Sequence, residues 1–133
     1  MANEATLMVE TQLPIMMTCA DGAGIEKGTI CVMTDPLTAA AATTSGQIIA
    51  GIAAEEKIAS DGKTKIAIYR GGIFKVTGSG NITVGNPLVH SPTPNIVQTA
   101  AVNAETVLGI ALETSTNTET LLIELRPTTM NLA

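Results

Sequence analysis

The sequence has few of the side chains that carry most protein chemistry. Its 133 residues include no tryptophan, one tyrosine, one phenylalanine and one histidine, and 7 basic residues stand against 12 acidic ones, for a net charge of -5. Nucleic-acid binding needs clustered lysine and arginine and aromatic faces for base stacking, so the composition argues against it. The same shortage of aromatic faces disfavours polymeric sugars. A single histidine, His90, excludes a multi-histidine metal site and leaves little general-base capacity near neutral pH.

Cysteine and long apolar runs are equally scarce. Cys19 and Cys31 lie too far apart for a Cys-x-x-Cys redox pair, and we expect two small buried hydrophobic residues and no disulfide. The first four residues lack the positive charge and long apolar run of a secretory signal, and no run is long enough to span a bilayer. We therefore predict cytoplasmic synthesis, no membrane partner and no cofactor.

What the sequence does contain is 45% hydrophobic residues, arranged in short runs. Glycine, proline, asparagine, aspartate and serine separate these runs, and short apolar runs bounded by such turn-forming residues are typical of an all-β domain. Residues 36–42 could form a short helix, but we favour a loop or a short edge strand there; 54–59 could form a single helical turn. The predicted strands are 29–32, 47–53, 64–69, 72–76, 87–89, 107–112 and 120–125.

An internal repeat is the strongest signal in the chain. An Ile-x-x-Gly motif and the strand after it, at 25–32, recur 57 positions later at 82–89. A Gly-Ile-Ala-x-Glu motif at 51–55 recurs 58 positions later, and 64–70 aligns with 120–126 at an offset of 56. The repeat predicts an N-terminal arm (1–24), a duplicated β-domain (25–126) and a C-terminal tail (127–133). Two such units packed together can close a small barrel or sandwich.

The N-terminal arm is apolar and needs a surface to lie on. It could complete its own barrel, or it could reach a neighbouring subunit by strand addition. We expect the duplicated domain to close without it, around a core that includes Ile66 and Ile123. The predicted partner-binding residues are Leu7, Val9, Leu13, Pro14, Ile15, Met16 and Met17.

No motif in the chain assembles a catalytic, metal or cofactor site. Glu55, Glu56 and Glu113 are interpreted as solvated strand-end charges, because no second catalytic residue type lies near them. His90 and Ser91 lie in a proline-stiffened loop without a third triad member. Lys63 is similar in placement to the modified lysine of biotinyl and lipoyl domains, but it lacks the flanking residues of those domains.

The order and spacing of these motifs resemble a known family. The segments at 51–64, 69–74, 82–85 and 107–113, with the opening at 2–6, are similar to those of the tailed-bacteriophage capsid cement, or head decoration, proteins. The resemblance covers residues 25–126. It implies a small β-barrel or β-tulip-like fold and a homotrimer that binds the major capsid protein at three-fold or quasi-three-fold sites.

Such a protein stabilises the shell from the exterior of the virion capsid after synthesis in the host cytoplasm. Two alternatives stay open: another structural or adhesive β-module of a virion, such as a tail or fibre component, and a carrier domain modified at Lys63.

Overall fold

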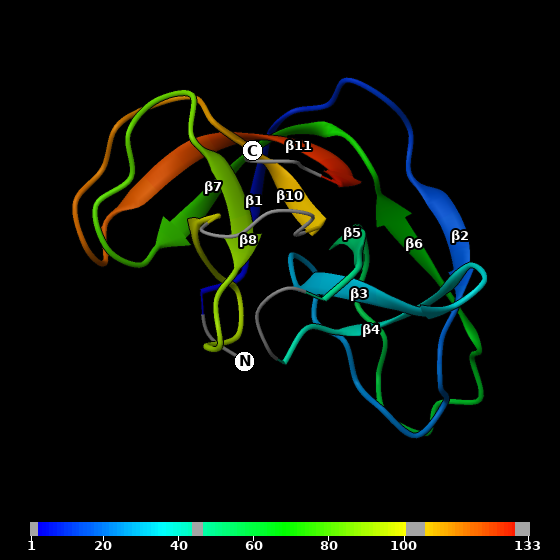
Figure 1. The fold of residues 1–133 in the computed structure, drawn as a ribbon. Helices are drawn as coiled ribbons and strands as arrows, with labels where there is room; N and C mark the ends of the chain where they lie inside the picture. Colours follow the sequence, from blue (N-terminus) through cyan, green and yellow to red (C-terminus); the bar gives the residue numbers. More distant parts are fainter. Residues whose placement is uncertain (1–2, 44–46, 101–105, 130–133) are drawn as a thin grey trace.

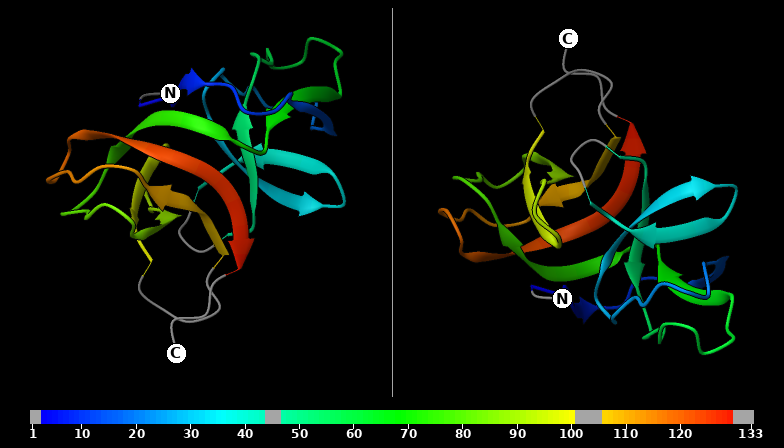
Figure 2. Two further views of the ribbon diagram at one scale, coloured as in Figure 1. Left: turned by 90° about the horizontal axis from the view of Figure 1, so that it is seen from above. Right: turned by 90° about the horizontal axis from the view of Figure 1, so that it is seen from below.

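The computed structural model describes residues 3–43, 47–100 and 106–129, and these fold into eleven β-strands and no helix. Each of the seven runs predicted as strands overlaps an observed strand. The strands form two barrels that lie side by side (Figures 1 and 2). The all-β class is confirmed, as are the two similar units; each unit closes into a barrel of its own.

The first barrel contains β2 to β6 in the closed order β2-β4-β3-β5-β6. All its pairings are antiparallel except that of β2 with β4, which is parallel and joins Thr18 to Thr38. Its strands are β2 (Ile15–Thr18), β3 (Ile30–Asp35), β4 (Thr38–Ala41), β5 (Ile49–Ala53) and β6 (Lys65–Tyr69).

The second barrel repeats this connectivity with β7 to β11. Its order is β7-β11-β10-β8-β9, and β9 returns to β7 through a parallel pairing of Thr77 with Ile96, which closes the ring. An additional strand, β1 (Thr6–Val9), pairs with β7 from outside the ring. The remaining strands are β7 (Gly72–Gly78), β8 (Pro87–His90), β9 (Ile96–Thr99), β10 (Thr106–Ala111) and β11 (Thr120–Thr129).

The structure corrects the predicted extent of the repeat. β2, which lies in the segment predicted as an arm, is the first strand of the first barrel, because the ring closes only when β2 pairs with both β6 and β4. Residues 127–129 of the predicted tail continue β11, and residues 130–133 lie outside the described residues. Ala53 pairs with Ile68 as Ala111 pairs with Ile123, so the last strands align at an offset of 55, not 56.

The two ambiguous segments resolve in different ways. Residues 38–41 form β4, so of the preferred loop or short edge strand the short strand is correct, but β4 pairs with both β3 and β2 and is not an edge strand. Residues 54–59 contain no helical turn; Lys57 instead forms an isolated antiparallel bridge with Ile25. Ser115 and Ile82 form the same bridge in the second unit. β9 was not predicted.

The Ile-x-x-Gly motif forms the same turn in both units. Gly28 and Gly85 both have φ of 89°, a left-handed conformation that glycine adopts at little cost. The N–H of Gly28 donates to the carbonyl of Ala53, and that of Gly85 donates to Ala111, at 2.9 and 2.8 Å. The turn therefore binds the Gly-Ile-Ala motif of its own unit, which explains why the two motifs recur together.

Alternation along the strands of the first barrel divides its apolar residues between two cores. Ile30 and Val32 face the large core shared with the second barrel, whereas Cys31 lies in a smaller core inside the first barrel. β5 is buried along its whole length and contacts β10 and β11. Ile66 and Ile123, the two predicted core residues, are both fully buried.

Candidate functional site

The predicted partner-binding segment presents most of its apolar side chains to solvent. Leu13 is 77% exposed, Met16 56% and Ile15 42%, and Val9 is also exposed. Exposed apolar residues that cluster in one segment mark an interaction surface, whereas isolated ones are ordinary. We call Val9, Leu13, Pro14, Ile15 and Met16 the β1–β2 surface.

Two of the predicted residues do not belong to this surface. Met17 is fully buried in the core of the first barrel, because it points inward on β2 opposite Ile66. Leu7 is partly buried and packs against the shared core. Their apolar character serves the fold of the chain itself, so neither side chain is available to a partner as Val9 or Leu13 is.

The segment between β1 and β2 joins the two barrels. In Figure 1 the chain leaves β1, passes over the top of the molecule and enters β2. Glu10 accepts a hydrogen bond of 3.0 Å from the hydroxyl of Tyr69 at the end of β6. The β1–β2 surface is therefore anchored to the protein at both ends and also between them.

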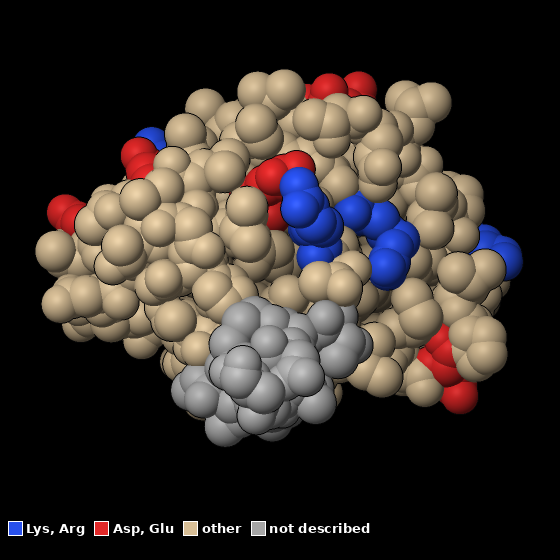
Figure 3. Space-filling view, turned by 45° about the horizontal axis from the view of Figure 1, so that its top comes forward, with Lys and Arg blue, Asp and Glu red and all other residues tan. Residues whose placement is uncertain are grey.

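The part of the β1–β2 surface that follows Glu10 is uncharged as well as apolar. No charged residue occurs between Glu10 and Asp21 in the sequence. On the face drawn in Figure 3, uncharged residues predominate and the charged groups lie in small separate clusters. Such a surface gains binding energy from apolar burial and backbone hydrogen bonds, not from charge attraction.

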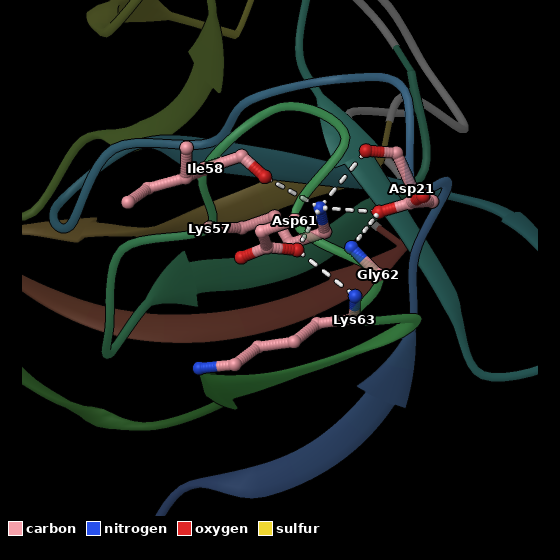
Figure 4. Close-up of polar contacts among 6 residues, drawn as sticks. All are labelled: Asp21, Lys57, Ile58, Asp61, Gly62 and Lys63. Carbon is pink, nitrogen blue, oxygen red and sulfur yellow. Dashed lines mark hydrogen bonds and ion pairs between the residues drawn. The ribbon is translucent and has the colours of Figure 1, made fainter.

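A second feature is a buried lysine that the sequence did not point to. Lys57 is almost fully buried, and its Nζ donates to the side chains of Asp61 at 2.8 Å and Asp21 at 3.2 Å (Figure 4). It also donates to the carbonyls of Ile58 at 2.7 Å and Asp21 at 2.9 Å. A buried ammonium is stable only with such partners. Position 115, the counterpart of Lys57, is a serine, and this departure from the repeat is the signal that could have revealed the cluster.

The lysine cluster holds two loops of the first barrel together. Burial opposes the charged form of Lys57, but the hydrogen bonds to Asp61 and Asp21 outweigh it and raise its pKa. The hydrogen bonds from Lys57 and from the backbone N–H of Lys63 lower the pKa of Asp61. Each of these charged groups is hydrogen-bonded within the cluster. The cluster is therefore a structural clamp between the Asp21 turn and the 57–63 loop.

The other sequence candidates have structural roles. The side chain of Glu55 accepts a hydrogen bond from the N–H of Ala67, and Glu113 accepts one from Leu122. His90 is buried, and its Nε2 accepts from the N–H of Asn95. Asn95 in turn accepts from the N–H of Ile30, which links the two barrels.

Lys63 and the two cysteines are the remaining chemical candidates. Lys63 is exposed and lies in a loop that is three residues longer than its counterpart in the second unit. Cys19 and Cys31 are buried and free, and burial raises the pKa of the Cys31 thiol to about 12. Among residues 3–43, 47–100 and 106–129, no three histidine, cysteine or acidic side chains gather in a way that could hold a metal ion. The same ranges contain no helix long and apolar enough to cross a membrane.

Fold and surface together define a class: an all-β, twin-barrel protein that presents an apolar surface and whose described polar clusters hold the fold together. The family model of the phage cement proteins matches residues 9–127. The chain belongs to this family, which is one of structural phage proteins.

A solved structure supports the fold. The N base of head fiber gp8.5 in bacteriophage phi29 is similar to this chain with a TM-score of 0.57 and 13% sequence identity. The match covers 95% of this chain and 99% of that one, so both barrels are included. A search of the curated proteins found no match.

Proposed function

We propose that this protein binds the outer surface of a bacteriophage capsid as a homotrimer and stabilises the shell. The family match over 9–127 carries the proposal. The partner is the major capsid protein, and the binding sites are the three-fold or quasi-three-fold positions between capsomers. The β1–β2 surface supplies the apolar contact.

A twin-barrel chain with structural polar clusters suits such a role. A clamp needs a packed body and apolar surfaces that a partner can cover, and the described residues form packed cores and expose apolar side chains. Further large apolar side chains are exposed outside the β1–β2 surface, including Leu37, Ile48 and Ile58. A trimer on a capsid has subunit contacts as well as capsid contacts, so it requires more than one such surface. Three modest contacts made at once then bind tightly.

Binding to shells tests the proposal directly. Purified protein is mixed with capsid shells that lack it, the mixture is sedimented, and the decorated shells are reconstructed by electron microscopy. We expect co-sedimentation, density at three-fold or quasi-three-fold sites, and a higher unfolding temperature of the shell. Light scattering during size-exclusion chromatography should give three times the chain mass. A monomer that leaves the shells bare would refute the proposal.

A second candidate function is the base of a fibre on the virion. The likeness to a head fiber base favours it, because the match covers both barrels. The same reconstruction separates the two: a fibre base carries density that continues outward from the shell, whereas a cement protein ends at the barrels. Density on the tail alone would exclude both. The family match gives no support to a carrier domain modified at Lys63.

A further inference from the structure

The two units differ at one strand edge. In the second unit, β9 pairs with the end of β7, and β1 covers the rest of that edge, with Leu7 opposite Phe74 and Thr6 opposite Lys75. In the first unit, β4 pairs with the end of β2 at Thr18 alone. Within the part of the chain that the structure describes, no strand covers the rest of this side of β2. We call the uncovered part, residues 13–16, the β2 edge.

Backbone groups on the β2 edge point outward. The N–H of Cys19 donates to the carbonyl of Thr64, the residue before β6, and that of Thr18 donates to the carbonyl of Leu37 on the opposite side. Backbone groups alternate along a strand, so those of Met16 lie on the side of Thr18, away from β6. An incoming strand can therefore pair with the N–H and the carbonyl of Met16 and with the carbonyl of Pro14.

Exposure shows that the first unit lacks the covering strand. Ile15 pairs with Ile68 as Phe74 pairs with Ile123, so Ile15 and Phe74 are equivalent. Phe74, beneath β1, is 1% exposed, whereas Ile15 is 42% exposed. The neighbouring outward position is a charged residue in the second unit, Lys75, but an apolar one in the first, Met16. Both faces of β2 beside this edge are therefore apolar and uncovered.

We infer that the β2 edge binds an extended, uncharged apolar strand of a capsid subunit, which adds antiparallel to β2 as β1 adds to β7. This inference rests on the proposed function. Backbone pairing to an open edge supplies affinity, and alternate side chains supply specificity. The strand β1 shows the chemistry that fits, because its sequence Thr-Leu-Met-Val is uncharged and Leu7 covers the position equivalent to Ile15.

In the register centred on Met16, a second copy of this chain does not fit the same edge. Two β2 strands that pair antiparallel about Met16 would place Pro14 of one copy opposite Thr18 of the other. Thr18 is already paired there with β4, so β4 of one copy would occupy the place of Pro14 of the other. This clash favours a partner strand that carries no barrel on its pairing edge, such as an extended arm or loop.

Hydrogen exchange on full-length wild-type protein tests the inference, with capsid shells that lack the protein as the probe. Exchange is measured by mass spectrometry on peptides that cover 13–18, in the free and the shell-bound states. We expect binding to slow exchange at Met16 by about tenfold or more, as one added backbone hydrogen bond implies. Unchanged exchange on shell-bound protein would overturn the inference and leave the proposed function standing.

Two variants give an independent measure. Met16→Pro removes the outward N–H but none of the pairing with β6, and proline is tolerated at strand edges. Its control, Met16→Ala, keeps the N–H and removes the side chain. We expect M16P to weaken shell binding about tenfold more than M16A. Equal binding by the two variants would overturn the inference; if M16P fails to fold, the exchange experiment decides.

Two further outcomes also overturn the inference. Protection of Met16 that rises with protein concentration in the absence of shells would mean that a second copy covers the edge. Wild-type protein that leaves the shells bare would remove the proposed function and the inference together. A reconstruction of decorated shells would show a positive result directly, as a capsid strand beside β2.

Discussion

Tyr69 and Phe74, the only two aromatic residues that the chain contains, contact each other edge to face with ring centroids 5.7 Å apart. Tyr69 ends β6 in the first barrel and Phe74 lies in β7 of the second. The Tyr69 hydroxyl donates to Glu10, which precedes the β2 edge. One aromatic pair therefore links both barrels to the segment that carries the candidate surface.

Truncation of Phe74 should destabilise both barrels. Phe74 is fully buried in the shared core, so Phe74→Ala should lower the free energy of unfolding by about 3–5 kcal/mol. The control, Tyr69→Phe, keeps the ring and removes only an exposed hydrogen bond, so it should cost about 1 kcal/mol or less. Urea unfolding measures both. Similar losses in the two variants would contradict the assignment of Phe74 as a central core residue.

The Lys57 cluster predicts how stability depends on pH. The folded-state pKa of Asp61 lies below its unfolded value, so its contribution is complete above about pH 3.9 and is lost as pH falls through the folded pKa. The pKa of Lys57 is raised, so its contribution is complete below about pH 10.4 and is lost as pH rises through the folded pKa.

A substitution taken from the second unit isolates this effect. Lys57→Ser places in the first unit the residue type that stands at 115 in the second, and it should flatten both limbs of a plot of urea midpoint against pH. The matched control is Lys63→Ser, an exposed lysine in the same loop, which should keep the wild-type curve. A K57S curve parallel to the wild-type curve would show that the cluster does not set the pH dependence.

The repeated glycines of the Gly-Ile-Ala motif have a steric cause that can be tested. A Cβ at Gly51 would overlap the carbonyl oxygen of Tyr69, and one at Gly109 would overlap that of Glu124. Because backbone must move to make room, alanine at either position should cost about 4 kcal/mol or more, by thermal or urea unfolding. Gly22, with open space around it, is the control and should change stability by about 1 kcal/mol or less. Mild effects at both 51 and 109 would contradict the close approach.

Local pattern predicted the strands that alternate and the turns that need glycine, but not how the units close. The β6 sequence reads as a half-buried strand because Ile66 and Ile68 alternate with more exposed residues, and this spacing is visible without a structure. The local sequence does not distinguish a strand that closes a barrel from an apolar arm. Ile15, Met16 and Met17 are all apolar, yet the first two are exposed and only Met17 is buried. Likewise, Asp21, which accepts hydrogen bonds from Lys57, lies 36 residues away in the sequence, and no local pattern reveals this contact.

Two N-terminal truncations separate the parts of the predicted arm. Removal of residues 1–24 takes away β2, so we now expect the first barrel to unfold, in contrast to the expectation from the sequence that the repeat closes alone. Removal of residues 1–9 takes away β1 and the buried Ala5, but no strand of either ring. β7 keeps its pairings with β11 and β9, so both barrels should persist, with a loss of about 1.5–3 kcal/mol from the uncovered Leu7 contact.

Amide exchange across the first barrel distinguishes these outcomes. Protection in β5 and β6 should disappear in the longer truncation and remain in the shorter one. If β6 stays protected without residues 1–24, the barrel closes by other means and β2 is an accessory strand. If it is lost even without residues 1–9, β1 supports the first barrel through Ala5, whose N–H donates to the carbonyl of Gly28 at 2.8 Å.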